Sequence, residues 1–69
     1  MKPEYYKSMS ITPIDYILDN NLDFCSANIV KYASRWKNKG TPTDDLKKII
    51  EYANILLERE QTKEEIERR

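Results

Sequence analysis

The chain contains no histidine, one cysteine and one glycine. Because Cys25 is the sole cysteine, no disulfide can form within the chain, and zinc sites built from clusters of cysteine and histidine are excluded. With Gly40 as its sole glycine, the chain cannot form a Gly-rich phosphate loop of the P-loop kind. A lone cysteine suits a reducing compartment, so we expect the protein to lie in the cytoplasm.

Long apolar runs and an excess of one charge are missing too. Lys and Arg total 12 and Asp and Glu total 12, which gives a formal net charge of zero. This balance argues against duplex nucleic acid as a partner, because proteins that bind it usually carry a net basic surface. No apolar run approaches the length of a membrane span, and the first residues do not have the apolar centre of a signal peptide, so we expect no membrane partner.

At 69 residues, the chain is one domain at most. A domain of this size buries a limited fraction of its surface and is marginally stable alone. Disulfides, metals and oligomerisation are the usual supports of small domains. The composition excludes an intrachain disulfide and a zinc site of the usual kind, so oligomerisation remains. The sequence therefore predicts a homo-oligomer.

The apolar pattern predicts an all-α fold, a small three-helix domain. Residues 1–11 are expected to form an irregular N-terminal arm and residues 12–57 the helical domain. Residues 58–69, where charged residues dominate, are expected to form a charged C-terminal helical extension. The extension buries almost nothing, so we expect either a helix exposed to solvent or a frayed tail.

Start and stop signals predict the bounds of the first two helices. Thr12 followed by Pro13 is typical of an N-cap and a first helical position, and this helix should end near Asn20. The second helix should begin near Asp23 or Ser26 and end near Asn38, with Gly40 as its C-terminal cap.

The third helix has the clearest apolar pattern. Thr43 is the expected N-cap, with Asp44 and Asp45 in the first turn. Tyr52 and Ile55 lie beside the main apolar arc, so we expect them at an interface between subunits. The residues expected to face the core within one chain are Leu46, Ile49, Ile50, Ala53, Leu56 and Leu57.

A cationic stripe runs along the second helix. At the helical angle of about 100° per residue, its members fall within an arc of roughly 100°. Three cations on one stripe repel one another unless anions neutralise them, and a phosphate is a natural candidate. The residues of this stripe are Asn28, Lys31, Tyr32, Arg35 and Lys39.

The third helix carries a polar stripe of its own, formed by Asp45, Lys48 and Tyr52. If the second and third helices pack antiparallel, both stripes border one cleft. Cations in that cleft suit phosphate groups, aromatic rings suit a base, and an amide suits a base edge or a ribose hydroxyl. The alternative is a solvated charged surface, in which Asp45 pairs with Lys48 or caps the helix and Tyr52 lies at the rim of the core.

Several short motifs occur in a fixed order along the chain. Asn28-x-x-Lys31-Tyr32-x-x-Arg35 is followed by Asp45-Leu46-x-Lys48 and then by Tyr52. Over roughly residues 3–57, the sequence resembles the small bacteriophage domain family known as SaV-like or phage nucleotide kinase. The resemblance implies a phage-encoded protein of the host bacterial cytoplasm that handles nucleotides. It also implies that one ligand site is formed by Asn28, Lys31, Tyr32, Arg35, Lys39, Asp45, Lys48 and Tyr52.

The sequence departs from that family near its N-terminus. Members of the family typically carry a His-Tyr pair there, whereas this chain has Tyr5 and Tyr6. A histidine serves as acid, base or ligand near neutral pH, and a tyrosine usually does not. We therefore include Tyr5 and Tyr6 among the ligand-binding residues but assign no catalytic residue. The alternative for this pair is that it covers an exposed edge of the core.

Kinases hold magnesium with carboxylates, and few lie near the proposed cleft. The plausible donors are Asp15, Asp44 and Asp45, two of which have roles at helix starts. The leading hypothesis is therefore a phage-encoded oligomer that binds a nucleotide or cyclic nucleotide without turnover, with no metal site and no cofactor. Such a protein would feed nucleotide metabolism or sequester a nucleotide second messenger of host immunity. The alternatives are a nucleoside monophosphate kinase and a protein-interaction module that acts on a host protein.

Overall fold

The computed structural model describes residue 6 and residues 9–68 of the chain. These residues form three helices, α1 (Pro13–Asp19), α2 (Phe24–Arg35) and α3 (Pro42–Glu67), and no strand. The prediction of a small all-α domain is therefore confirmed. Of the predicted N-terminal arm, the described part is Tyr6 and residues 9–11, and Tyr5 lies outside the described residues.

Helix α1 starts where the sequence predicts. Thr12 is its N-cap, and Pro13 occupies the first turn. Backbone N–H groups in the first turn have no acceptor within the helix, so the N–H that proline lacks costs no hydrogen bond. The backbone N–H of Asp15 donates to the Thr12 hydroxyl over 3.3 Å, and that hydroxyl donates to the Asp15 carboxylate over 2.7 Å. The two side chains thus satisfy each other at the positive end of the helix.

Helix α2 begins as predicted but ends earlier. Asp23 is its N-cap and accepts from the backbone N–H of Ser26 over 2.9 Å. The helix ends at Arg35 instead of near Asn38, and a turn follows it. Gly40 therefore does not cap α2 directly. It takes a φ of +98° in the connection to α3, a conformation that glycine adopts without steric strain.

The Asp23 cap makes the stability of α2 depend on pH. Hydrogen bonding to Ser26, through its side chain first and its backbone N–H second, lowers the pKa of the Asp23 carboxyl below 3.8. A lowered pKa in the folded chain means that the cap stabilises α2 above pH 3.8 and that this stabilisation is lost on further acidification. Asp23→Asn keeps an N-cap acceptor that does not titrate. We expect Asp23→Asn to flatten the loss of helical circular dichroism on acidification, and superimposable acid titrations would contradict the assignment.

The N-cap of α3 lies two residues before the predicted one. This cap is Thr41, not Thr43, because Pro42 takes the first helical position just as Pro13 does in α1. Asp44 and Asp45 lie in the first turn, as predicted. The helix continues without a break to Glu67, and the side chains of its last turns are exposed.

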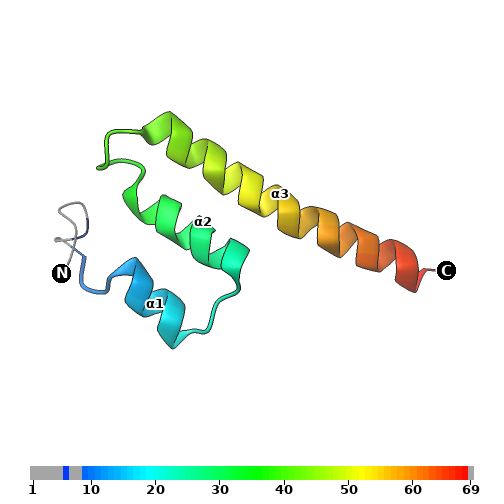
Figure 1. The fold of residues 1–69 in the computed structure, drawn as a ribbon. Coiled ribbons are helices and arrows are strands. Elements are labelled where there is room, and N and C mark those ends of the chain that lie inside the picture. The colour runs from blue at the N-terminus through cyan, green and yellow to red at the C-terminus, as the bar shows by residue number, and fades with distance from the viewer. Residues whose placement is uncertain (1–5, 7–8, 69) are drawn as a thin grey trace.

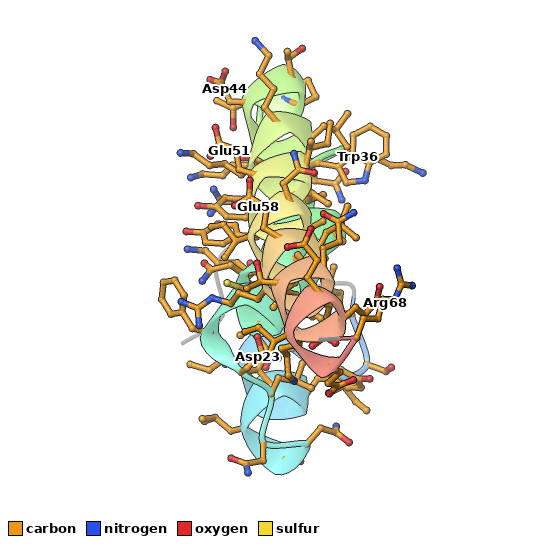
Figure 2. All side chains as sticks on the ribbon, turned by 90° about the vertical axis from the view of Figure 1, so that its right-hand side faces the viewer. Asp23, Trp36, Asp44, Glu51, Glu58 and Arg68 are labelled. Carbon is orange, nitrogen blue, oxygen red and sulfur yellow. The ribbon has the colours of Figure 1, made fainter. Side chains whose placement is uncertain are left out.

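The three helices form a single layer. Helix α2 lies between α1 and α3 and runs antiparallel to both, while the second half of α3 extends beyond α2 (Figure 1). The Cα trace measures 50 × 28 × 14 Å, and contacts join α1 to α2 and α2 to α3. Figure 2 views this layer along its edge: Asp44, Glu51 and Glu58 project on one side of it, and Trp36 and Arg68 on the other.

A layer one helix thick has little interior. Among the described residues, Pro13 is the one buried apolar residue, and the other buried residues are Thr12 and Asp45. The predicted core face of α3 is therefore wrong in part. Ile49 and Leu56 are half-buried as expected. Leu46, Ile50, Ala53 and Leu57 are exposed, because they lie on a different side of the helix from the one that contacts α2.

The interface between subunits predicted for Tyr52 and Ile55 stays a prediction. Tyr52 is half-buried and packs against α2 within the same chain. Ile55 remains exposed. Tyr52 lies about 40° from Leu56 around α3, which places both on the side that faces α2.

Candidate functional site

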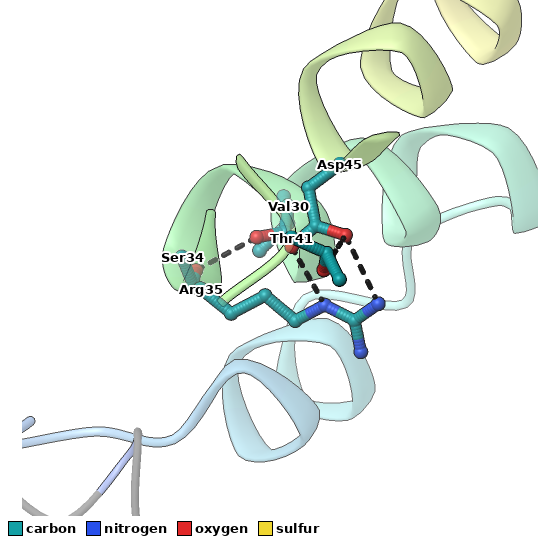
Figure 3. Close-up of polar contacts among 5 residues, drawn as sticks. All are labelled: Val30, Ser34, Arg35, Thr41 and Asp45. Atoms are coloured by element: carbon teal, nitrogen blue, oxygen red, sulfur yellow. Dashed lines mark hydrogen bonds and ion pairs between the residues drawn. The ribbon is translucent and has the colours of Figure 1, made fainter. Parts of the chain in front are cut away.

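The last turn of α2 and the first turn of α3 are joined by an ion pair. The Arg35 guanidinium donates twice to the Asp45 carboxylate, from Nε over 3.2 Å and from an Nη over 3.3 Å (Figure 3). Such a two-point contact fixes both orientation and distance. Arg35 and Asp45 therefore set how α2 and α3 meet at the connection between them.

Both charges of this pair are shielded from water. The side chain of Arg35 is 11% exposed and that of Asp45 is 3% exposed. The Thr41 hydroxyl donates to the same carboxylate over 3.4 Å. On the other side of the last turn of α2, the Ser34 hydroxyl donates to the Val30 carbonyl over 2.7 Å. A buried charge is tolerated only when it is paired and hydrogen-bonded, and Asp45 meets both conditions.

Aromatic rings and cations gather beside the ion pair. The rings of Tyr32 and Tyr52 stack at 16°, with centroids 6.3 Å apart, and Phe24 meets Tyr52 edge-on at 5.8 Å. The Arg35 guanidinium carbon lies 4.6 Å from the Tyr32 centroid, and the Lys31 ammonium lies 5.2 Å from it. We call Phe24, Lys31, Tyr32, Arg35 and Tyr52 the tyrosine cluster.

The cluster brings together part of the predicted ligand site. Lys31, Tyr32 and Arg35 from α2 meet Tyr52 from α3, as expected for two stripes that border one interface. Asp45 is adjacent, but its partner is Arg35 and not Lys48. The alternative pairing of Asp45 with Lys48 is therefore wrong.

Other predicted residues lie elsewhere or have other partners. Asn28 is half-buried, and its side-chain amide donates to the Phe24 carbonyl one turn earlier in α2 over 2.9 Å. Lys39 is exposed beyond the end of α2, so it does not share the helical stripe. Lys48 is exposed and pairs with Glu51 over 3.4 Å. Tyr6 is half-buried, and its carbonyl accepts from the Met9 N–H over 3.1 Å.

Two residues that contribute to the site, Phe24 and Thr41, were not predicted from the sequence. Phe24 precedes Asn28 by four residues and therefore lies on the same stripe of α2, so the helical spacing alone was enough to include it. Thr41 had no comparable signal. Its contact with Asp45 depends on where α3 begins, and that start was predicted at Thr43.

Two further features of the described residues bear on what the site can hold. They contain no group of three or more His, Cys, Asp or Glu side chains placed to hold a metal ion. An open hollow of about 530 Å³ lies along the exposed half of α3, and it shares no residue with the tyrosine cluster. Its lining consists of Leu56, Glu58, Arg59, Glu60, Thr62 and Lys63.

Residues 1–54 match DUF3310, a family described as proteins of unknown function. The chain belongs to the DUF3310 family. The match includes the whole tyrosine cluster, the Arg35–Asp45 pair and the first half of α3, and it stops before the charged extension. Comparisons with curated proteins and with solved structures give no match. Among the described residues, no helix combines the length and the apolar character needed to cross a membrane.

Proposed function

We propose that this chain binds a phosphorylated nucleotide at the tyrosine cluster. The observation that carries the proposal is the placement of two cations, Lys31 and Arg35, against the ring of Tyr32. Cations suit phosphate oxygens, and neighbouring aromatic rings suit a base. The cluster offers both kinds of surface within one interface between two helices.

The charges around the cluster support an anionic ligand. Asp45 lies within ion-pair distance of Arg35, but among the described residues no carboxylate lies within that distance of Lys31. Lys31 is half-buried, so its charge is less well hydrated than that of a fully exposed lysine. A phosphate at Lys31 would balance this charge.

An exposed ring is available for the base. Phe24 is 72% exposed although its ring and that of Tyr52 meet in a T-shaped contact. It lies seven residues before Lys31 on the same side of α2, about 10 Å away along the helix axis. We infer that the base stacks on Phe24 and that the phosphate reaches Lys31, with Arg35 positioned by Asp45 beside it.

We further propose, from the resemblance to the phage nucleotide kinase family, that this is a bacteriophage protein that acts in the cytoplasm of a bacterial host. Binding without turnover would then supply nucleotides or sequester a nucleotide second messenger, a mononucleotide or a cyclic one. The Arg35–Asp45 pair favours binding over transfer, because the carboxylate nearest the cluster is occupied by an arginine.

Lys31→Met tests the proposal with little risk to the fold, because methionine keeps much of the length of the side chain and removes the charge. A charge-assisted contact contributes about 1.5–3 kcal/mol, so we expect nucleotide affinity to fall roughly tenfold or more. Titration calorimetry with mono-, di-, tri- and cyclic nucleotides measures the change and identifies the preferred phosphate number.

Lys47→Met is the matched control, because Lys47 is an exposed lysine of α3 outside the cluster. We expect its nucleotide affinity to equal that of the parent chain. Equal affinities of Lys31→Met and Lys47→Met, or no binding of any nucleotide by the parent chain, would reject the site. Formation of a nucleoside diphosphate from ATP and a monophosphate in the presence of magnesium would replace binding without turnover by the kinase alternative.

A further inference from the structure

Helix α3 carries an apolar surface that the fold of one chain leaves uncovered. Leu46, Ile50 and Leu57 are large apolar residues of which 39%, 60% and 54% is exposed. Together with Ala53 they recur at intervals of four, three and four residues, the spacing by which two helices pack along a seam. The surface, which we call the α3 seam, consists of Leu46, Ile50, Ala53 and Leu57.

The position of the seam follows from helical geometry. Its four residues fall within about 60° of one another around α3 and lie about 100° from the side that faces α2. Arg68 follows Ile50 by about five full turns, so the seam points to the side on which Figure 2 places Arg68 and Trp36. The seam therefore lies on one broad face of the layer.

The chain exposes more surface than a folded monomer of its mass usually does, as it would if a partner covered part of it. The accessible surface is 5634 Å², about 1,100 Å² more than the roughly 4,500 Å² typical of a folded monomer of 8.2 kDa. The radius of gyration is 14.8 Å, against about 11 Å for a compact domain of this length. A standard interface buries about 800 Å² on each partner, so the excess is of the size that one partner covers.

The layered shape leads to the same conclusion. Stable domains pack two layers around a core, and the described residues form one layer in which Pro13 is the one buried apolar residue. An identical chain is present wherever the protein is synthesised, and it could form the second layer. We propose that two copies associate through their α3 seams, with the two α3 helices antiparallel about a two-fold axis.

The seam is self-complementary in that arrangement. When two α3 helices lie antiparallel, Leu46 faces Leu57 of the second copy and Ile50 faces Ala53 of the second copy. One register aligns all four positions, because the intervals between them, four, three and four residues, are the same in both chain directions. Each contact then occurs twice, as an isologous interface requires.

Charge selects the antiparallel arrangement over the parallel one. The same four-and-three spacing continues beyond Leu57 to Glu60 and Glu64. In a parallel pair, each of these glutamates would face its counterpart in the second copy, and like charges at such short range repel. In the antiparallel pair, Glu60 faces Thr43 of the second copy, and Glu64 lies beyond the start of its α3.

Sedimentation of Ile50→Glu and Ile66→Glu tests the seam. Both residues are isoleucines of α3 with nearly equal exposure, 60% and 62%, but Ile66 lies outside the seam. We expect the parent chain and Ile66→Glu to sediment at twice 8.2 kDa, or a multiple of it, at micromolar concentration. Ile50→Glu places two charges in the interface, so we expect dimer affinity to fall roughly 100-fold or more.

A monomeric parent chain at these concentrations, or identical behaviour of the two variants, would overturn the proposal. If Ile50→Glu does not fold, the parent chain still decides the matter by its melting temperature. That temperature rises with protein concentration when folding and association are linked, and a constant value would overturn the proposal.

Disulfide formation tests the direction of the helices. In a Cys25→Ser background, chains carrying Leu46→Cys alone and Leu57→Cys alone are oxidised separately and then as a mixture. Two Cα atoms must lie within about 7 Å to be bridged, so we expect covalent dimers in the mixture only. Covalent dimers in either separate sample would show a parallel pair and overturn the antiparallel arrangement. Absence of covalent dimers from the mixture would overturn it too.

The dimer is independent of the nucleotide site. The seam lies about 130° from Tyr52 around α3, so association leaves the tyrosine cluster uncovered. Ile50→Glu and Lys31→Met therefore report on separate surfaces, and failure of one proposal leaves the other standing.

Discussion

Asp45→Ala is expected to remove most of the packing between α2 and α3. The substitution leaves the Arg35 guanidinium, 11% exposed, without the carboxylate that it contacts through two nitrogens. Breaking a buried ion pair by removing one partner costs about 3–5 kcal/mol, which is most of the stability of a small domain. Urea unfolding followed by circular dichroism should show the midpoint falling to a low urea concentration. Helicity should already be reduced when no urea is present.

Two comparisons separate the ion pair from other effects at the start of α3. Asp44→Ala removes the neighbouring exposed carboxylate from the same turn, and we expect a loss of about 0.3–1 kcal/mol from the helix dipole alone. The double variant Arg35→Met with Asp45→Leu removes both charges and should be more stable than Asp45→Ala alone. A double variant as unstable as the sum of its single changes would show that the pair itself contributes nothing.

Tyr52→Ala is expected to have the next largest effect on stability. The Tyr52 ring contacts two rings of α2, stacking on Tyr32 and meeting Phe24 in a T-shaped contact. Truncation of a fully buried aromatic residue costs about 3–5 kcal/mol, and Tyr52 is half-buried, so we expect about 2–3 kcal/mol. Urea unfolding measures the loss, and near-ultraviolet circular dichroism reports the changed surroundings of the remaining rings.

Ile55→Ala is the control for this prediction, because Ile55 lies on the same helix and is 41% exposed. We expect it to change stability by less than about 1 kcal/mol. Tyr52→Phe keeps both ring contacts and should stay close to the parent chain. If Tyr52→Ala were no more destabilising than Ile55→Ala, the tyrosine cluster would not be what holds α2 against α3.

Local signals in the sequence were sufficient for the helices themselves. Thr12 with Pro13 marked the start of α1, and Asp23 was one of the two starts proposed for α2, because caps and prolines act on neighbouring backbone groups. The errors at the connection after α2 have a local cause too. Thr41 and Thr43 both flank Pro42, and only the position of the proline within the first turn distinguishes the actual cap.

Part of the predicted stripe on α2 lies together in the structure, but Arg35 has a partner on α3 that the stripe alone did not indicate. Lys31, Tyr32 and Arg35 lie on one side of a helix by spacing alone. The pairing of Arg35 with Asp45 spans ten residues and a turn, and no local rule assigns one of several nearby carboxylates to one of several cations.

The sequence by itself determined that the chain is helical, where α1 begins and which residues share a side of each helix, because these properties depend on contacts between residues close in sequence. Only the tertiary structure decided which side of α3 meets α2. Helix α3 carries two neighbouring apolar arcs, and the apolar pattern of the sequence did not separate them. The arc with Tyr52 packs within the chain, and the arc with Ile50 remains exposed, because one layer of helices can cover only one side of α3.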